Sequence, residues 1–187
     1  MPFSQETADY FSRRKEQLEA LKAKTKIGIF GSFSGSRKDD LISLKKYLRD
    51  NGYIAIISED LDKRSENERK KSDPVCDRKL SEKLIKECDI HIFILPREYE
   101  GEPANLAQSV SMEIERLHTL SECGKKSEKY VAVFAETDLI ATMGGVCKGL
   151  LQLKGDDWVV EEYNEIQEIF KVIRQFCLIC IQDMYRF

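Results

Sequence analysis

The feature that most constrains the fold is a short apolar run, IHIFIL at Ile90–Leu95, between Asp89 and Pro96. A run this short and this continuously apolar is typical of a central strand in a parallel sheet, because helices cover both faces of such a sheet. Stretches with a helical pattern separate it from three further strand-like runs, KIGIF at Lys26–Phe30, YIAIIS at Tyr53–Ser58 and YVAVFA at Tyr130–Ala135.

This alternation of strands and helices predicts one α/β domain with a parallel sheet of about five strands, the last a short edge strand at Trp158–Val160. We expect a flavodoxin-like three-layer sandwich with strand order 2-1-3-4-5. An extra amphipathic helix is expected within residues 1–25, ahead of the domain at 26–187. A long C-terminal helix is expected from about Glu161 to Arg186.

Composition limits the classes of function. The 187 residues are 42% hydrophobic and 34% charged, which fits one domain with a substantial core. A net charge of −3 without a sustained basic face argues against nucleic acid as the main partner. The apolar runs are too short for a membrane span and the N-terminal segment is too charged for a secretory signal, so we expect a cytoplasmic protein with no membrane partner.

The six cysteines are interpreted as thiols rather than as disulfides or metal ligands. Cys177 and Cys180 are spaced as a CxxC, but they lie on the apolar face of the C-terminal helix, where core packing is the simpler interpretation. His91 belongs to a strand core and His118 to the polar side of a helix. The sequence therefore predicts no metal site.

One acidic residue departs from the apolar pattern of the helix that follows Pro96. Glu113 falls inside a stripe that includes Val110 and Leu117, and an ionised carboxylate on such a face is unfavourable without a partner. The plain alternative is that Glu113 extends to water or pairs with a Lys or Arg. The functional interpretation depends on the helix starting at the carboxyl end of a strand, where open parallel sheets bind ligands.

A loop of small residues, Gly31 to Arg37, follows the first strand and precedes a helix expected from about Asp39 to Asn51. Backbone N–H groups in such a loop can bind an anion, and the Arg37 guanidinium can add a planar pair of donors. The loop matches neither a Walker A motif nor GxGxxG, so ordinary turn chemistry is an equal alternative.

Two further features have functional and plain interpretations. Asp60 follows the second strand, where an acidic residue can hold ribose hydroxyls, although a solvated loop explains it equally well. The C-terminal helix is apolar all round at Phe176–Ile181, which predicts burial under the first helix or a contact between two copies of the chain.

The segments KIGIFGSFSGSRKDD, YIAIISEDL, DRKLSEKLIKECDIHIFILPREYEGE and SMEIERL together resemble the layout shared by Toll/interleukin receptor (TIR) domains and nucleoside 2-deoxyribosyltransferase-like proteins. The resemblance covers about Lys26 to Phe176. These families bind or cleave N-glycosidic nucleosides, including NAD for the TIR enzymes, with a glutamate that corresponds by position to Glu113. The serine and cysteine that TIR enzymes place before the glutamate are absent, since Val110 and Ala107 stand three and six residues before it.

The resemblance implies a protein that binds a nucleoside or nucleotide and cleaves its N-glycosidic bond with Glu113 as the catalytic residue. NAD or a nucleoside would be the substrate, and no cofactor is implied. The expected substrate-binding residues are Gly31, Ser32, Phe33, Ser34, Arg37, Asp60, Tyr99, Ser109 and Ser111. The alternative is a non-catalytic module of the same fold that senses a nucleotide or assembles as a homo-oligomer through its C-terminal helix.

Overall fold

The computed structural model describes residues 5–33, 36–69, 73–97, 106–143, 145–154 and 157–186. Five parallel strands form one sheet in the order β2-β1-β3-β4-β5, which confirms the predicted flavodoxin-like topology. The strands are β1 (Lys26–Phe30), β2 (Ile54–Ile56), β3 (Ile90–Leu95), β4 (Val131–Glu136) and β5 (Val159–Tyr163).

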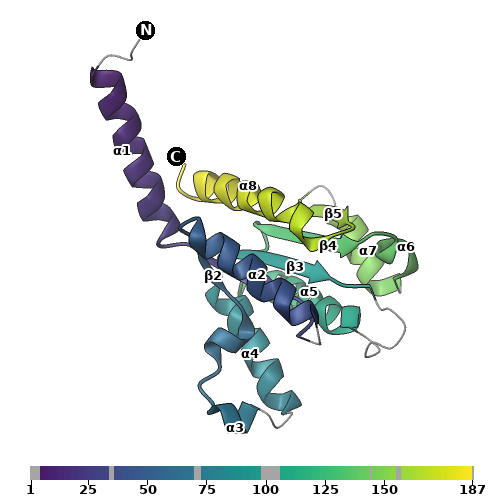
Figure 1. Cartoon of the computed structure of the whole chain (residues 1–187). Coiled ribbons are helices and arrows are strands. Elements are labelled where there is room, and N and C mark those ends of the chain that lie inside the picture. Colours follow the sequence, from purple (N-terminus) through teal and green to yellow (C-terminus); the bar gives the residue numbers. More distant parts are fainter. Residues whose placement is uncertain are drawn as a thin grey trace.

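Helices lie on both faces of this sheet and complete the three-layer sandwich (Figure 1). They are α1 (Gln5–Lys22), α2 (Ser36–Asp50), α3 (Glu66–Arg69), α4 (Pro74–Glu87), α5 (Leu106–Glu122), α6 (Leu139–Thr142), α7 (Gly145–Leu153) and α8 (Ile166–Met184). A short 3₁₀ helix, η1 (Ser58–Leu61), follows β2.

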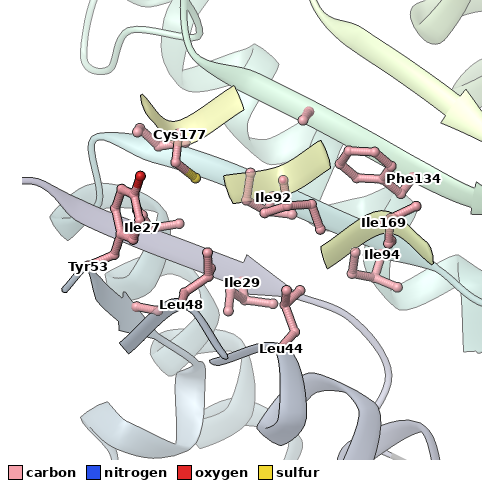
Figure 2. Packing of buried hydrophobic residues seen from close by; sticks show 14 of the residues in the cluster. Ile27, Ile29, Leu44, Leu48, Tyr53, Ile92, Ile94, Phe134, Ile169 and Cys177 are labelled. Atoms are coloured by element: carbon pink, nitrogen blue, oxygen red, sulfur yellow. The ribbon is translucent and has the colours of Figure 1, made fainter. Parts of the chain in front are cut away.

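Helices α2 and α8 cover one face of the sheet, where alternate side chains of the central strands meet them. Figure 2 shows this packing, in which Ile29 of β1 and Ile92 of β3 belong to one cluster with Leu44 of α2 and Ile169 of α8. All four side chains are almost fully buried. Cys177 of α8 lies in the same cluster, and burial raises the pKa of its thiol well above the usual value, so the expected core role of this cysteine fits its surroundings.

Helices α4 to α7 cover the opposite face through a second cluster that includes Phe93, Ile85, Val110 and Leu150. The dipeptide Asp73-Pro74 predicts the start of a helix, with Asp73 as the N-cap and Pro74 at the first helical position. The structure confirms this start, because the Asp73 side chain accepts a hydrogen bond from the backbone N–H of Cys76 and Pro74 occupies the first turn of α4. For the glycine-containing stretch after β4 the sequence predicts a broken helix or a loop, and the structure has two short helices there, α6 and α7.

Some predicted boundaries were wrong. The C-terminal helix begins at Ile166 rather than near Glu161, because the chain continues as β5 to Tyr163 and pairs with β4. Helix α2 begins at Ser36, three residues before the expected start. The mixed charge run from Lys63 to Asp73 predicts a solvated loop, but it contains α3, so part of the run is helical.

Helix α1 projects from the body and contacts it near its C-terminal end (Figure 1). Leu18 and Leu21 pack against the cluster under α2 and α8, and the Lys22 ammonium lies 4.9 Å from the centre of the Tyr53 ring. Within the described ranges, no helix combines the length and apolar content that crossing a membrane requires.

Candidate functional site

The strand order brings the segments that leave β1 and β3 to the same edge of the sheet, because these two strands are neighbours and both run toward it. Gly31 and Ser32 follow β1 and are buried, and Phe33 is partly buried against the core. A Cβ at Gly31 would lie 2.7 Å from Cδ2 of Leu41, so glycine permits the close approach of this loop to α2. Ser34 and Tyr99 lie outside the described residues.

A buried carboxylate at the end of β4 joins two of these segments. Glu136 is 5% exposed, and its Oε1 accepts a hydrogen bond from Nη1 of Arg37 at 3.1 Å. Its Oε2 accepts from the backbone N–H of Arg97, just after β3. Nη2 of Arg37 donates in turn to the backbone carbonyl of Arg97 at 3.1 Å. This Arg37–Glu136–Arg97 group fixes the start of α2 against the ends of β3 and β4.

The group changes the expectation for Arg37. We expected this guanidinium to point its donors at a phosphate or carboxylate of a ligand, and the structure directs at least two of them at Glu136 and Arg97. Asp40 lies close by, and its pKa is raised because burial outweighs the favourable effect of Arg37. An incoming phosphate would therefore compete with Glu136 for the Arg37 donors.

Glu113 is a residue of α5, and its partly buried side chain faces α4. Ser81 Oγ of α4 donates a hydrogen bond to Oε1 of Glu113. Among the described residues, Ser81 is the hydrogen-bond partner of this carboxylate. Burial raises the pKa of Glu113 to about 7, while the Ser81 bond acts in the opposite direction. The side chain thus neither extends into open solvent nor pairs with Lys or Arg among the described residues.

The serines expected near Glu113 lie elsewhere on α5. Ser109 is exposed, and Ser111 Oγ donates to the carbonyl of Ala107 at 2.8 Å. Ser111 and Cys147 help to line a pocket of about 340 Å³ between α5 and α7. Among the described residues, neither serine therefore forms a hydrogen bond with the Glu113 carboxyl.

Asp60 serves the local structure of η1. One of its oxygens accepts from the backbone N–H of Ile57 at 3.0 Å and lies 3.3 Å from Nη2 of Arg49. The other oxygen accepts from the ammonium of Lys45 at 2.9 Å. These contacts tie η1 to α2 and engage the carboxylate that was expected to hold ribose hydroxyls.

Sequence reasoning missed Glu136, Arg97 and Ser81. For Glu136 a signal was present, since an acidic residue directly extends the buried run at Val131–Ala135 at the carboxyl end of a strand. Ser81 sits among charged neighbours on α4, and its pairing with Glu113 depends on how two helices dock. Among the described residues, no cluster of three or more His, Cys, Asp or Glu side chains could hold a metal ion.

No family model matches the chain, and no curated protein matches it in sequence. Among solved structures, it is similar to a 2-deoxyribosyltransferase from the psychrotolerant bacterium Bacillus psychrosaccharolyticus, described as a biocatalyst for the synthesis of antiviral and antitumoral nucleosides. The two share 15% sequence identity and a TM-score of 0.45 over 78% of this chain and 90% of that one. A similarity of this extent assigns no activity to this chain.

Proposed function

We propose that this chain binds a nucleoside or nucleotide at the carboxyl ends of its strands and cleaves the N-glycosidic bond with Glu113. The observation that carries the proposal is the setting of the Glu113 carboxyl between two helices, with Ser81 as its partner and a pKa raised to about 7. Strongly perturbed carboxyl groups are concentrated at functional sites.

The chemistry follows from that pKa. Near neutral pH the carboxyl is present in both protonated and ionised forms, which suits a group that must exchange a proton or act as an anion. When the bond between the sugar carbon and the base nitrogen breaks, its electron pair leaves with the base and positive charge develops on the sugar. The Glu113 carboxylate would stabilise that charge or attack the sugar carbon, and water or a second base would complete the reaction.

The edge of the sheet supplies groups for the substrate. Phe33 is partly exposed, so a base can stack on its ring. Because Arg37 is engaged by Glu136, a neutral nucleoside suits this edge better than a ligand that needs the Arg37 guanidinium for its phosphate. NAD remains a candidate through its nicotinamide riboside half.

The proposal is tested by incubating the purified chain with NAD and with purine and pyrimidine deoxynucleosides and measuring base release by chromatography. Glu113→Gln should reduce release by about 100-fold or more, the usual contribution of an acid–base group. Glu122→Gln is the matched control, because Glu122 is exposed on the same helix and should leave the rate unchanged. A second free base in the mixture separates transfer, which yields a new nucleoside, from hydrolysis. Equal rates in wild type and Glu113→Gln would refute the role of Glu113.

A second candidate function is assembly of the chain as a homo-oligomer through α8. Ile179 of α8 is 63% exposed although the same helix buries Cys177 and Ile181 on its sheet side. Val172 and Phe176 precede Ile179 by seven and three residues, so they lie on the same side of α8, and both are only partly buried. A contiguous exposed apolar surface of this kind is a feature of contact surfaces. This candidate predicts self-association without base release.

Light scattering at several protein concentrations distinguishes the candidates. Assembly through α8 predicts a mass above that of one chain that falls in Ile179→Glu. The exposed polar position Gln175, changed to Glu, is the control on the same helix and should leave the mass unchanged. A single-chain mass at all concentrations would exclude this mode of assembly.

A further inference from the structure

A groove of about 510 Å³ lies between α4 and the segment that follows β2. One wall is formed by η1 and the residues leading into α3, and the other by α4. The lining residues are Leu61, Asp62, Lys63, Arg64, Glu68, Cys76, Lys79, Leu80 and Lys83. None of the candidate residues discussed above belongs to this groove.

The α4 wall is a single flank of the helix. Cys76, Lys79, Leu80 and Lys83 have the spacing i, i+3, i+4 and i+7, which aligns side chains on one side of a helix. Ser81 falls on a different side, where it meets Glu113 of α5. The groove and the Glu113 carboxyl therefore lie on separate flanks of α4.

The acidic groups around the groove are engaged within the protein. Asp62 is buried and holds the Arg64 guanidinium through both of its oxygens at 2.9 to 3.1 Å. Arg64 also donates to Asp77 at 3.2 Å. The Glu68 carboxylate accepts from the backbone N–H of Ser65 at 2.8 Å. These carboxylates are thus committed to partners on the protein.

Among the described residues, two of the three lysines that line the groove lack an acidic partner. Within the described ranges, neither Lys63 nor Lys79 has an acidic group within 4.0 Å of its ammonium, and Lys83 has Glu87 at 3.6 Å. Asp62 and Arg64 balance each other's charge, whereas Glu68 keeps its negative charge because its partner Ser65 is neutral. The groove lining still has four cationic side chains against two carboxylates, and an anion held by Lys63 and Lys79 would balance that excess of positive charge.

We propose that this groove binds a phosphate-bearing small molecule with an apolar or aromatic part, such as a nucleoside diphosphate. The phosphates meet Lys63 and Lys79, and the apolar part lies on the half-buried Leu61 and Leu80. The volume lies within the range of roughly 300–1,000 Å³ that is typical of small-molecule sites. This site does not rest on the proposed glycosidic reaction.

The test is titration calorimetry of the full chain with ADP, adenosine and inorganic pyrophosphate. We expect ADP to bind saturably and to bind more weakly as salt is added, because its phosphates contact the lysine ammonium groups. Adenosine lacks these phosphates, so its affinity should be at least about tenfold lower than that of ADP. The double variant Lys63→Ala/Lys79→Ala should weaken ADP binding about tenfold. Both lysines are exposed, so the variant should keep the wild-type unfolding curve.

Two controls locate the site. Lys86→Ala removes an exposed lysine from α4 outside the groove and should leave ADP binding unchanged. The double variant should also leave the base release proposed for Glu113 unchanged, which separates this site from the proposed reaction. The proposal is overturned if neither ADP nor pyrophosphate binds, or if the double variant binds ADP as wild type does. It is also overturned if a single-stranded oligonucleotide binds more tightly than ADP through the same two lysines.

Discussion

Arg37 and Glu136 form a largely buried ion pair, with Nη1 and Oε1 3.1 Å apart, although 99 residues separate them in the sequence. Their side chains are 14% and 7% exposed. The pair links the first residues of α2 to the last residue of β4, and the carboxylate also holds the backbone of Arg97. The edge of the sheet where a substrate is proposed to bind is thus held by a charge pair inside the protein.

Removing one partner of this pair should be strongly destabilising. Glu136→Ala leaves the Arg37 guanidinium beside the sheet without its carboxylate, and we expect a loss of about 3 kcal/mol in the free energy of unfolding. Urea denaturation gives the value. The control is Asp50→Asn, whose partner Lys46 is 76% exposed and which should change stability by less than about 1 kcal/mol. Equal effects of the two substitutions would contradict a stabilising role for the buried pair.

Gly31 should not tolerate a methyl group. Its added Cβ would lie 2.7 Å from Cδ2 of Leu41, which is 2% exposed and has little space to move. Gly31→Ala is expected to destabilise the fold by about 1–3 kcal/mol. At Gly149, on α7, a Cβ meets nothing within 4 Å, so Gly149→Ala should be neutral or stabilise by up to about 1 kcal/mol. Thermal unfolding of both variants checks the contrast, which fails if they shift in the same direction.

The Glu113 carboxyl should make the folded state less stable at higher pH. Its pKa is about 7 in the folded chain and near 4.5 when unfolded, so the folded state binds its proton more tightly. The contribution is therefore unfavourable above pH 7 and disappears as pH falls to 4.5, a change of at most about 3 kcal/mol. Urea denaturation from pH 5 to 8.5 should show a smaller decline in Glu113→Gln than in wild type. Parallel curves for the two proteins would disprove this linkage.

His91 should have the opposite effect. It is fully buried in β3, its Nε2 lies 3.0 Å from the carbonyl of Ile85, and burial lowers its pKa to about 4. The unfolded chain takes up a proton near pH 6.5 and the folded chain resists it, so stability falls as pH drops from 6.5 toward 4. His91→Phe keeps a ring beside Phe30 and should gain stability relative to wild type as the pH falls from 6.5 toward 4. A difference in stability between variant and wild type that is the same at every pH would show that His91 makes no such contribution.

The two groups act in overlapping pH ranges, and their slopes oppose each other between pH 4.5 and 6.5. Wild-type stability should therefore change little there through these two residues. Glu113→Gln should expose the His91 effect as a steeper loss in acid. Unfolding curves of wild type and Glu113→Gln measured at pH 5 and pH 6.5 test these opposing effects on stability.

The sequence alone determined the sheet and its order. Continuous apolar runs such as Ile90–Leu95 form strands only where helices cover both faces, and the helical stretches between runs require parallel crossovers. It also identified the start of α4 at Asp73–Pro74, because capping depends on neighbours in the chain. Glu113 stood out for the same local reason, as a carboxylate within an apolar stripe.

The tertiary structure decided which groups meet. The pairing of Glu113 with Ser81 depends on how α4 and α5 dock, and that of Arg37 with Glu136 depends on which strand ends are adjacent. Neither relation has a periodic signal, since hydrogen bonds between distant residues are set by the packing of whole elements. The hydrophobic pattern of the chain specifies its helices and strands, because that pattern reflects the local geometry of each element. The partners of the buried charged groups are determined only when the helices and strands pack together.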